Sequence, residues 1–397
     1  MSVIFIGGAS GTDQKKASDN ICNSLGNAIP LKFDEYLEEE AGYPPYLLFD
    51  HFYRDRKTIT EYVNKACDSI VQEVEKNTSE GKNVMLLLHF TYFRRGHIIP
   101  NPALEFLLRK LNPKSILVLV DDCYHCLFRI LQRIIRNRRP LFQELDPLSF
   151  LVWREAELSQ ALSLTYRGYP VYLVANKHDK RTLIRLVQHA FGFRKCKLAY
   201  ISHHITMPRR KAIERKISLD KLEEVIEIQD FKRKLIEKCD NLVLFDPTTI
   251  DELIYDEDNN LKLAINKEDR WPFFESLHDD YIFPVDLSSN DFRRELYSSI
   301  DVKNTSYREQ MRYQIEMQIE SRDFLYINQS DMLIVYRPTM YNVASGIMAE
   351  IYTAMAQQKP VYAFTPHKEE RQRKRKLFDL MRWIDDKELL FDIIRDP

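Results

Sequence analysis

The sequence predicts two α/β domains, each a mostly parallel β-sheet flanked by helices. Short apolar runs of strand length alternate with longer amphipathic segments, which is typical of βαβ units around a parallel sheet. One series of alternating segments ends near residue 194, and a second series begins there. The chain of 397 residues is also too long for a single ordinary domain, because domains of about 100–200 residues are typical.

The first predicted domain, residues 1–193, contains four strand candidates. They are the apolar runs at residues 3–6, 84–88, 116–120 and 170–174. Segments between them, such as 59–74 and 102–111, carry apolar residues at three- and four-residue spacing, which predicts helices. A further helix-like segment, 183–193, ends this half of the chain.

The second predicted domain, residues 194–397, begins with an apolar run at 197–201. Its other strand candidates are the runs at 242–245, 324–327, 332–336 and 361–364. A long polar interval, 251–322, lies between the first two of these candidates. We predict that this interval is an insertion or lid on a small α/β domain.

The charge and cysteine content exclude several classes of protein. Lys and Arg number 58 against 59 Asp and Glu, so the net charge of -1 gives no general attraction to nucleic acid or to anionic membranes. Six cysteines in this length do not form a disulfide framework, and no second close pair accompanies Cys123 and Cys126. The first residues lack a basic signal-peptide region, and no apolar run reaches about 18 residues. We expect a reduced cytoplasmic protein without a metal, a membrane segment or a nucleic-acid partner.

The chain opens with a strand that runs into a glycine-rich turn, residues 3–12. A phosphate cradle needs this arrangement, because inward-pointing backbone N–H groups and a helix amino terminus together attract anions. The stretch resembles the first strand and P-loop of small-molecule kinases from Ile4 to Gly11. Where that pattern continues Gly-Lys-Ser/Thr, this chain has Thr12-Asp13-Gln14.

This departure removes the lysine that reaches the β- and γ-phosphates and the hydroxyl that holds Mg²⁺. Asp13 instead directs a carboxylate toward the phosphate position, and Gln14 offers no hydroxyl. The resemblance implies ATP and Mg²⁺ as ligands of this loop. The phosphate-binding residues that it implies are Gly8, Ser10, Gly11, Thr12 and Lys15. Three interpretations stay open: a degenerate P-loop domain used for scaffolding or ligand sensing, an active nucleotide kinase, and an unrelated glycine turn.

A set of carboxylates stands out between residues 322 and 364. Asp323 precedes a predicted short helix or turn, and Asp331 lies at the mouth of a buried strand. Ser345-Gly346 opens the next predicted helix, and Glu350 falls one turn inside it. A helix that follows a parallel strand begins at the carboxyl edge of the sheet, where α/β proteins bind ligands. We therefore expect Glu350 to face that crevice.

This stretch resembles the nucleoside 2-deoxyribosyltransferase family. The similarity rests on an Asp before a strand, an Asp followed by four apolar residues and Tyr-x-Pro, a glycine-containing helix start and a nucleophilic Glu. Residues 197–206 resemble the family's opening strand and loop, and residues 242–247 resemble its second strand. The resemblance covers about 200 residues from Lys195 onward and implies a flavodoxin-like sheet.

The resemblance implies that Glu350 is the nucleophile, that Asp323 is the general acid/base and that Tyr200 orients Glu350 by hydrogen bonding. Such a pair suits cleavage of an N-glycosidic bond, because one carboxylate stabilises the oxocarbenium-like sugar and a carboxylic acid protonates the departing base. No cofactor is needed for this reaction. The implied substrate-binding residues are Asp331, Arg337, Asn342, Ser345, Gly346, Ser202 and His203, although Asp331 also suits holding the strand end.

The chain departs from this family where Ala344 replaces an Asp that binds the sugar hydroxyl; Asn342 and Ser345 lie nearby as replacements. Arg337 offers a cation for a phosphate or pyrophosphate. We therefore expect a nucleotide or NAD-like dinucleotide more than a free deoxynucleoside.

The expected function is cleavage of, or transfer from, the N-glycosidic bond of a nucleoside, nucleotide or NAD-like molecule. Related folds in bacterial antiviral defence degrade NAD or nucleotides, and a sensor-plus-effector layout fits that role. The alternatives are a nucleotide kinase and a non-catalytic nucleotide sensor or scaffold. We expect a homo-oligomer, because in the resembling family a neighbouring subunit often completes the pocket.

Overall fold

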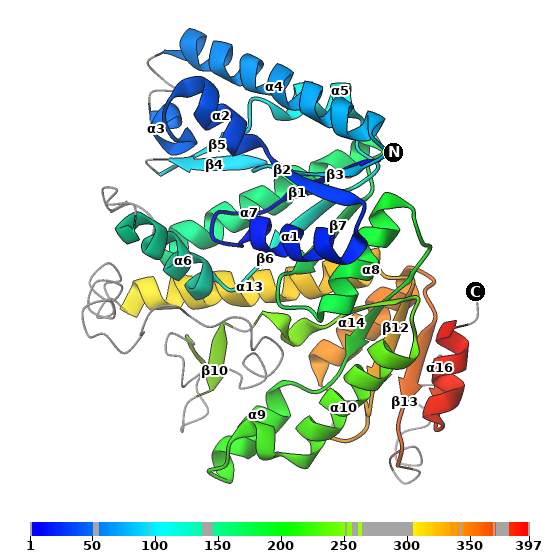
Figure 1. Ribbon diagram of the computed structural model, residues 1–397. Coiled ribbons are helices and arrows are strands. Elements are labelled where there is room, and N and C mark those ends of the chain that lie inside the picture. Colours follow the sequence, from blue (N-terminus) through cyan, green and yellow to red (C-terminus); the bar gives the residue numbers. More distant parts are fainter. Residues whose placement is uncertain are drawn as a thin grey trace. The chain divides into compact units, whose positions relative to one another are not determined.

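The protein is described from a computed structural model (Figure 1). The structure describes residues 2–50, 55–94, 96–136, 146–250, 252–255, 261–263, 305–341, 344–367, 370 and 381–395. The chain forms two compact units. Unit 1 comprises the described residues within 1–176, 187–193 and 288–311, and unit 2 comprises those within 177–186, 194–287 and 312–397.

Unit 1 is built on a five-stranded parallel sheet in the order β2-β3-β1-β6-β7. The strands are β1 (Val3–Gly7), β2 (Ala28–Lys32), β3 (Asn83–Leu87), β6 (Ile116–Val120) and β7 (Val171–Ala175). Strands β1, β3 and β6 are buried along their whole length, which explains their continuous apolar sequence. A hairpin of β4 (Thr91–Arg94) and β5 (His97–Pro100) follows β3.

Helices connect the strands of unit 1 (Figure 1). They are α1 (Gln14–Leu25), α2 (Phe33–Ala41), α3 (Pro45–Asp50), α4 (Arg56–Ser79), α5 (Leu104–Leu111), α6 (Cys123–Arg136) and α7 (Pro147–Ser163). Asp55 and Asp146 begin α4 and α7 by accepting a backbone hydrogen bond from the third residue beyond. The division between the units falls within α8 (Lys180–Phe191).

Unit 2 is built on a second five-stranded parallel sheet, in the order β14-β13-β12-β8-β9. The strands are β8 (Lys197–Ser202), β9 (Leu242–Phe245), β12 (Met332–Tyr336), β13 (Val361–Phe364) and β14 (Arg382–Ile384). Counted along the chain this is the flavodoxin-like order 2-1-3-4-5, whose direction reverses between β8 and β12. Ligands bind at the carboxyl ends of strands beside such a reversal.

The helices of unit 2 cover both faces of its sheet (Figure 1). They are α9 (Thr206–Glu214), α10 (Glu223–Lys238), α13 (Thr305–Gln329), α14 (Ser345–Ala356) and α16 (Lys387–Arg395). The hairpin of β10 (Leu253–Tyr255) and β11 (Leu261–Leu263) follows β9. Ala199 and Ile201 of β8 pack in one core with residues of α10 and α16. Because side chains alternate along a strand, Tyr200 and Ser202 point to the other face.

The predicted α/β class with mostly parallel sheets is confirmed. One strand prediction was wrong: residues 324–327 belong to the last turns of α13. Tyr326 and Ile327 are buried while Asn328 is exposed, so this short apolar run is the buried stripe of a helix. Asp323 consequently lies on α13 itself and does not precede a separate turn. Most of the predicted insertion, 251–322, lies outside the described residues.

Over the part of the chain that the structure describes, no helix combines the length and apolar character that a bilayer crossing requires.

Candidate functional site

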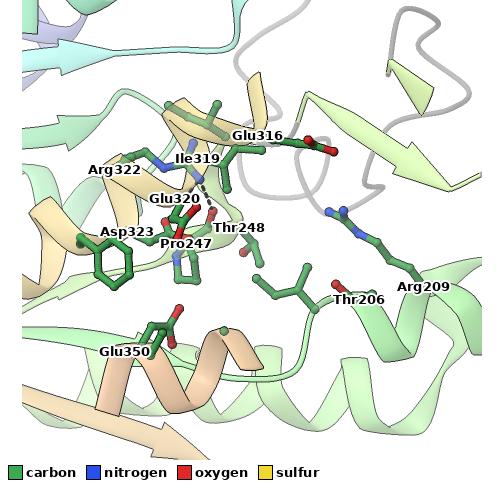
Figure 2. A pocket seen from close by; sticks show the side chains of 15 residues that line it. Thr206, Arg209, Pro247, Thr248, Glu316, Ile319, Glu320, Arg322, Asp323 and Glu350 are labelled. Atoms are coloured by element: carbon green, nitrogen blue, oxygen red, sulfur yellow. Dashed lines mark hydrogen bonds and ion pairs between the residues drawn. The ribbon is translucent and has the colours of Figure 1, made fainter. Parts of the chain in front are cut away.

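Unit 2 contains a cavity of about 310 Å³ at the carboxyl edge of its sheet (Figure 2). Its walls come from the start of α9, the turn after β9, one face of α13 and the first turns of α14. Figure 2 shows Asp323 and Glu350 approaching this space from α13 and α14. The residues that the sequence analysis placed on separate elements therefore line one cavity.

Glu350 is hydrogen-bonded to a residue of the sheet. The Tyr200 hydroxyl donates a 2.9 Å hydrogen bond to Glu350 Oε1. Burial, together with the charge of Asp323, raises the pKa of Glu350 to about 8. The hydroxyls of Tyr200 and Ser202 act in the opposite direction. The buried Ser202 Oγ contributes although it makes no hydrogen bond of ordinary geometry within the described part of the chain.

Asp323 lies beside a buried guanidinium. Arg322 Nη2 is 3.4 Å from Asp323 Oδ1. Burial raises the pKa of Asp323 to about 6, and Arg322 opposes that rise. The carboxylates of Asp246 and Glu320 raise this pKa further.

The two carboxyl groups interact, because the charge of Asp323 raises the pKa of Glu350. With pKa values of about 6 for Asp323 and about 8 for Glu350, the pair carries a single proton between these pH values. Such a pair offers one carboxylate and one carboxylic acid to the same ligand near neutral pH. Because Glu350 has the higher pKa, this proton lies mostly on Glu350, and the tautomer with the proton on Asp323 is the minor one.

The structure brings one of the predicted substrate-binding residues that it describes to this cavity. Gly346 lines it. Ser202 and His203 are buried at the end of β8, and Ser345 is exposed at the start of α14; these three are not among the lining residues. Asn342 lies outside the described residues.

Asp331 and Arg337 are placed elsewhere. Asp331 precedes β12, and its carboxylate accepts a 2.8 Å hydrogen bond from the Leu198 backbone N–H at the amino edge of the sheet. Arg337 follows β12 and is buried in ion pairs with Glu227 and, at 2.6 Å, with Glu370. A substrate phosphate would have to displace these carboxylates to reach the guanidinium.

Sequence reasoning missed several lining residues, among them Arg209, Thr248, Glu320 and Arg322. Glu316, Glu320 and Asp323 follow one another at spacings of four and three residues, so they share one face of α13. This spacing was a readable signal. Glu316 and Glu320 instead fall within the predicted insertion 251–322. Because residues 324–327 were predicted to be a strand, a helix that contains Glu316, Glu320 and Asp323 together was not expected.

Unit 1 contains a second cavity, of about 450 Å³, beside the glycine loop. Ser10, Gly11, Thr12 and Lys15 line it, as does Gln14. Lys15 also forms an exposed 2.7 Å ion pair with Glu35. Gly8 is not a lining residue, and its carbonyl accepts a 2.7 Å hydrogen bond from Gln14 Nε2.

The backbone of this loop revises the alignment with the P-loop pattern. Asp13 has φ 57°, a left-handed conformation that favours glycine. Counting from Gly8, the pattern G-x-x-x-x-G-K places its second glycine at Asp13 and its lysine at Gln14. Gln14 is the first residue of α1. In this alignment Gln14 stands where the pattern has its lysine, and Asp13 stands where it has its second glycine.

A buried acid–base cluster forms another wall of the unit 1 cavity. His89 Nδ1 donates to the Gly8 carbonyl at 2.7 Å and lies 3.2 Å from Glu157 Oε1. Its Nε2 lies 3.5 Å from Asp34 Oδ2, and the Tyr92 hydroxyl donates to Asp34 Oδ1 at 3.0 Å. The carboxylates of Asp34 and Glu157 raise the pKa of His89 against the effect of its burial. Sequence reasoning did not select these residues.

Comparison with known proteins gives no family model and no curated protein that matches this chain. Solved structures that are similar to its N-terminal part include a putative kinase from Chloroflexus aurantiacus, with 15% identity, 48% of this chain and 96% of that chain covered and a TM-score of 0.30. Shikimate kinase from Acinetobacter baumannii has 16% identity, coverage of 48% and 92% and a TM-score of 0.31. Deoxyadenosine kinase from M. mycoides has 18% identity, coverage of 48% and 99% and a TM-score of 0.28.

None of these three structures is a glycosidase or a deoxyribosyltransferase. Similarity at this level does not assign a function to this chain. A functional proposal therefore has to rest on the chain's own side chains.

Proposed function

We propose that unit 2 cleaves, or transfers from, the N-glycosidic bond of a nucleoside, nucleotide or NAD-like molecule. The observation that carries this proposal is the convergence of Asp323 and Glu350 on one cavity. Their raised pKa values, about 6 and about 8, leave the pair with one proton near neutral pH. Two carboxyl groups with separated pKa values are the general requirement of glycosidic cleavage.

The reaction proceeds in two steps. The reacting form is the minor tautomer of the singly protonated pair, in which Glu350 is ionised and Asp323 carries the proton. Glu350 Oε attacks the anomeric carbon, the bond from that carbon to the base nitrogen breaks, and Asp323 donates its proton to the departing base. Water or a second base then attacks the same carbon, giving its proton to Asp323 and releasing Glu350 as a carboxylate. Tyr200 favours the charged form of Glu350, because its hydroxyl donates to Oε1.

Arg337 does not indicate the charge of the substrate. The charged residues that line the cavity do. Arg337 is engaged by Glu227 and Glu370, whereas Arg209 and Arg322 line the cavity together with Glu316, Glu320 and the two reacting carboxyl groups. Nucleosides, nucleotides and NAD therefore all belong in the test.

The experiment is incubation of the pure protein with a panel of nucleosides, deoxynucleosides, their 5′-monophosphates and NAD, followed by chromatography for free base. Adding a second base distinguishes transfer from hydrolysis. Base release from at least one member supports the proposal. No release from any member, with the protein shown to be folded, contradicts it.

We propose as a second candidate that unit 1 binds a nucleotide, and phosphorylates a small molecule if it is an active kinase. The cavity beside the glycine loop favours this candidate, and the kinases named above are similar in fold to about half of the chain. Gln14 in the lysine position weighs against phosphoryl transfer, because it removes the cation on the β- and γ-phosphates. Labelled ATP with the same panel separates the outcomes: phosphorylated product indicates a kinase, and tight binding without turnover indicates a sensor.

A role in bacterial antiviral defence and a homo-oligomeric state stay predictions. The first is tested by phage challenge of cells that carry the wild-type protein or Glu350→Gln, with protection expected for the wild type alone. The second is tested by the native mass in solution.

A further inference from the structure

Asp246 fixes a short turn in the cavity wall. It follows β9, and its Oδ1 accepts hydrogen bonds from the Thr248 backbone N–H at 2.9 Å and from Thr248 Oγ1 at 2.7 Å. These bonds cap the 3₁₀ turn Pro247–Thr249. Pro247 and Thr248 both line the unit 2 cavity, whereas Asp246 does not.

Lys232 holds Asp246 from α10. Its Nζ lies 2.7 Å from Asp246 Oδ2 and donates to Thr248 Oγ1 at 3.3 Å. The side chain of Lys232 is 5% exposed, so the ion pair is largely removed from water. Such pairs cost desolvation energy and are a poor source of stability by themselves. A role in placing the turn accounts for the pair better than stability does.

The same turn holds the guanidinium beside Asp323. Arg322 Nη2 donates to the Pro247 carbonyl at 3.1 Å and lies 3.4 Å from Asp323 Oδ1. Arg322 is buried, and its Nε has no hydrogen-bond partner within the described parts of the chain. Among the described residues, the hydrogen bond to the Pro247 carbonyl is therefore the shorter of the two contacts given above for this guanidinium.

We propose that Asp246 and Lys232 are positioning residues for Asp323, acting through the 247–249 turn and Arg322 and through the negative charge of Asp246. This inference rests on the proposed glycosidic function of the cavity. Neither residue lines the cavity. Together they set where the Asp323 carboxyl lies and how readily it keeps its proton.

The charges around both carboxylates agree with this role. The charged groups that shift the pKa of Asp323 are Arg322 and Glu320 of α13 and Asp246 after β9. Asp323 in turn raises the pKa values of Glu350 and Tyr200, which face it from α14 and β8. Asp246 itself faces Lys232 of α10, His203 at the end of β8 and His178, whose Nε2 accepts from the Asp246 backbone N–H. Lys232 and His203 hold the pKa of Asp246 well below its usual range, so Asp246 stays charged. Its charge raises the pKa of Asp323.

The test compares Asp246→Asn and the double variant Lys232→Met/Asp246→Asn with the wild type. Asp246→Asn removes the negative charge, so the acid-side limb of the kcat/KM profile should move to lower pH by about half a unit to one unit. The double variant also removes the Lys232 charge, so its shift should have the same direction and be smaller, because Asp246 and not Lys232 is among the main charges that act on Asp323. The rate constant kcat should fall about tenfold with little change in KM, because a misplaced acid affects the reacting state more than binding. Asp392→Asn, an exposed change of equal charge on α16, should shift nothing.

An unshifted acid-side limb in folded Asp246→Asn overturns the inference. Asp246→Asn alone leaves Lys232 buried and unpaired, so it is the variant at risk of unfolding, whereas replacing both partners of a buried ion pair is generally tolerated. Carbon-13 NMR titration of the Asp323 carboxyl, assigned with Asp323→Asn, measures the same shift without an activity. An unshifted carboxyl in both variants therefore refutes the positioning role, and absence of base release by the wild type refutes the proposed function separately.

Discussion

The Tyr200 hydroxyl donates a 2.9 Å hydrogen bond to Glu350 Oε1, which joins the central part of strand β8 to the first turns of helix α14. Tyr200 is fully buried, so this bond has a fixed origin in the sheet. It holds one oxygen of Glu350, whose side chain lines the cavity. The arrangement couples the sheet directly to the proposed nucleophile.

The activity of unit 2 should follow a bell-shaped dependence on pH. The pair is active while it holds one proton, so kcat/KM should rise through about pH 6 and fall through about pH 8, the pKa values of Asp323 and Glu350. Tyr200→Phe removes a donor to charged Glu350, so its alkaline-side limb should move to higher pH. Initial rates of base release measured from pH 5 to 9 give both profiles, and an alkaline-side limb that moves to lower pH in Tyr200→Phe contradicts the assigned contact.

Replacing Glu350 should make the protein more stable at alkaline pH. The folded-state pKa of Glu350 is raised from 4.5 to about 8, so between these values the folded state binds more protons than the unfolded state. Stability contributed by this group is therefore present below pH 4.5 and is lost as the pH rises to 8. Glu350→Gln should unfold at higher urea concentration than the wild type at pH 8, with the difference smaller at pH 5. Equal midpoints at both pH values would show that Glu350 is not held in its neutral form.

Arg337 should matter for stability and not for substrate charge. Arg337→Met leaves Glu227 and Glu370 without their shared partner, and breaking such a partly buried network costs about 3 kcal/mol. The ratio of activities on a nucleotide and on its nucleoside should not change. Urea unfolding and parallel kinetics measure the two effects. A selective loss of nucleotide activity would return Arg337 to the substrate site.

Restoring the P-loop pattern should increase nucleotide binding by unit 1. Asp13→Gly/Gln14→Lys changes the charge of the cavity lining by two positive units and supplies the glycine that the left-handed φ of 57° favours. Calorimetric titration with Mg·ATP should show at least about tenfold tighter binding than the wild type. Glu75→Lys, an exposed change of equal charge on α4, is the matched control. Equal affinities in all three proteins would indicate an unrelated glycine turn.

Much of the architecture was predictable because the buried parallel strands are continuous apolar runs. The segments 3–6, 116–120 and 332–336 coincide with or fall within β1, β6 and β12. Strand β2 was missed because Pro30 and its half-buried neighbours break the apolar pattern. Residues 324–327 were misassigned because four apolar residues carry no period that separates strand from helix.

The candidate site was predictable as far as the spacing of its motifs allowed. Asp323 and Glu350 could be selected because a sheet edge gathers residues from separate turns. Arg337 could not be placed, since its partners Glu227 and Glu370 are more than 30 residues away along the chain. The contacts from Lys232 to Asp246 and from Arg322 to Pro247 are likewise set by tertiary packing.

Release of free base by four proteins tests the central claim most directly. The wild type, Glu350→Gln, Asp323→Asn and the exposed control Glu388→Gln are incubated at pH 7 with the substrate identified from the panel. The account predicts equal release by the wild type and Glu388→Gln, a loss of about a thousandfold or more in Glu350→Gln and a loss of about a hundredfold or more in Asp323→Asn. Undiminished release by either Glu350→Gln or Asp323→Asn, with the fold retained, would contradict it.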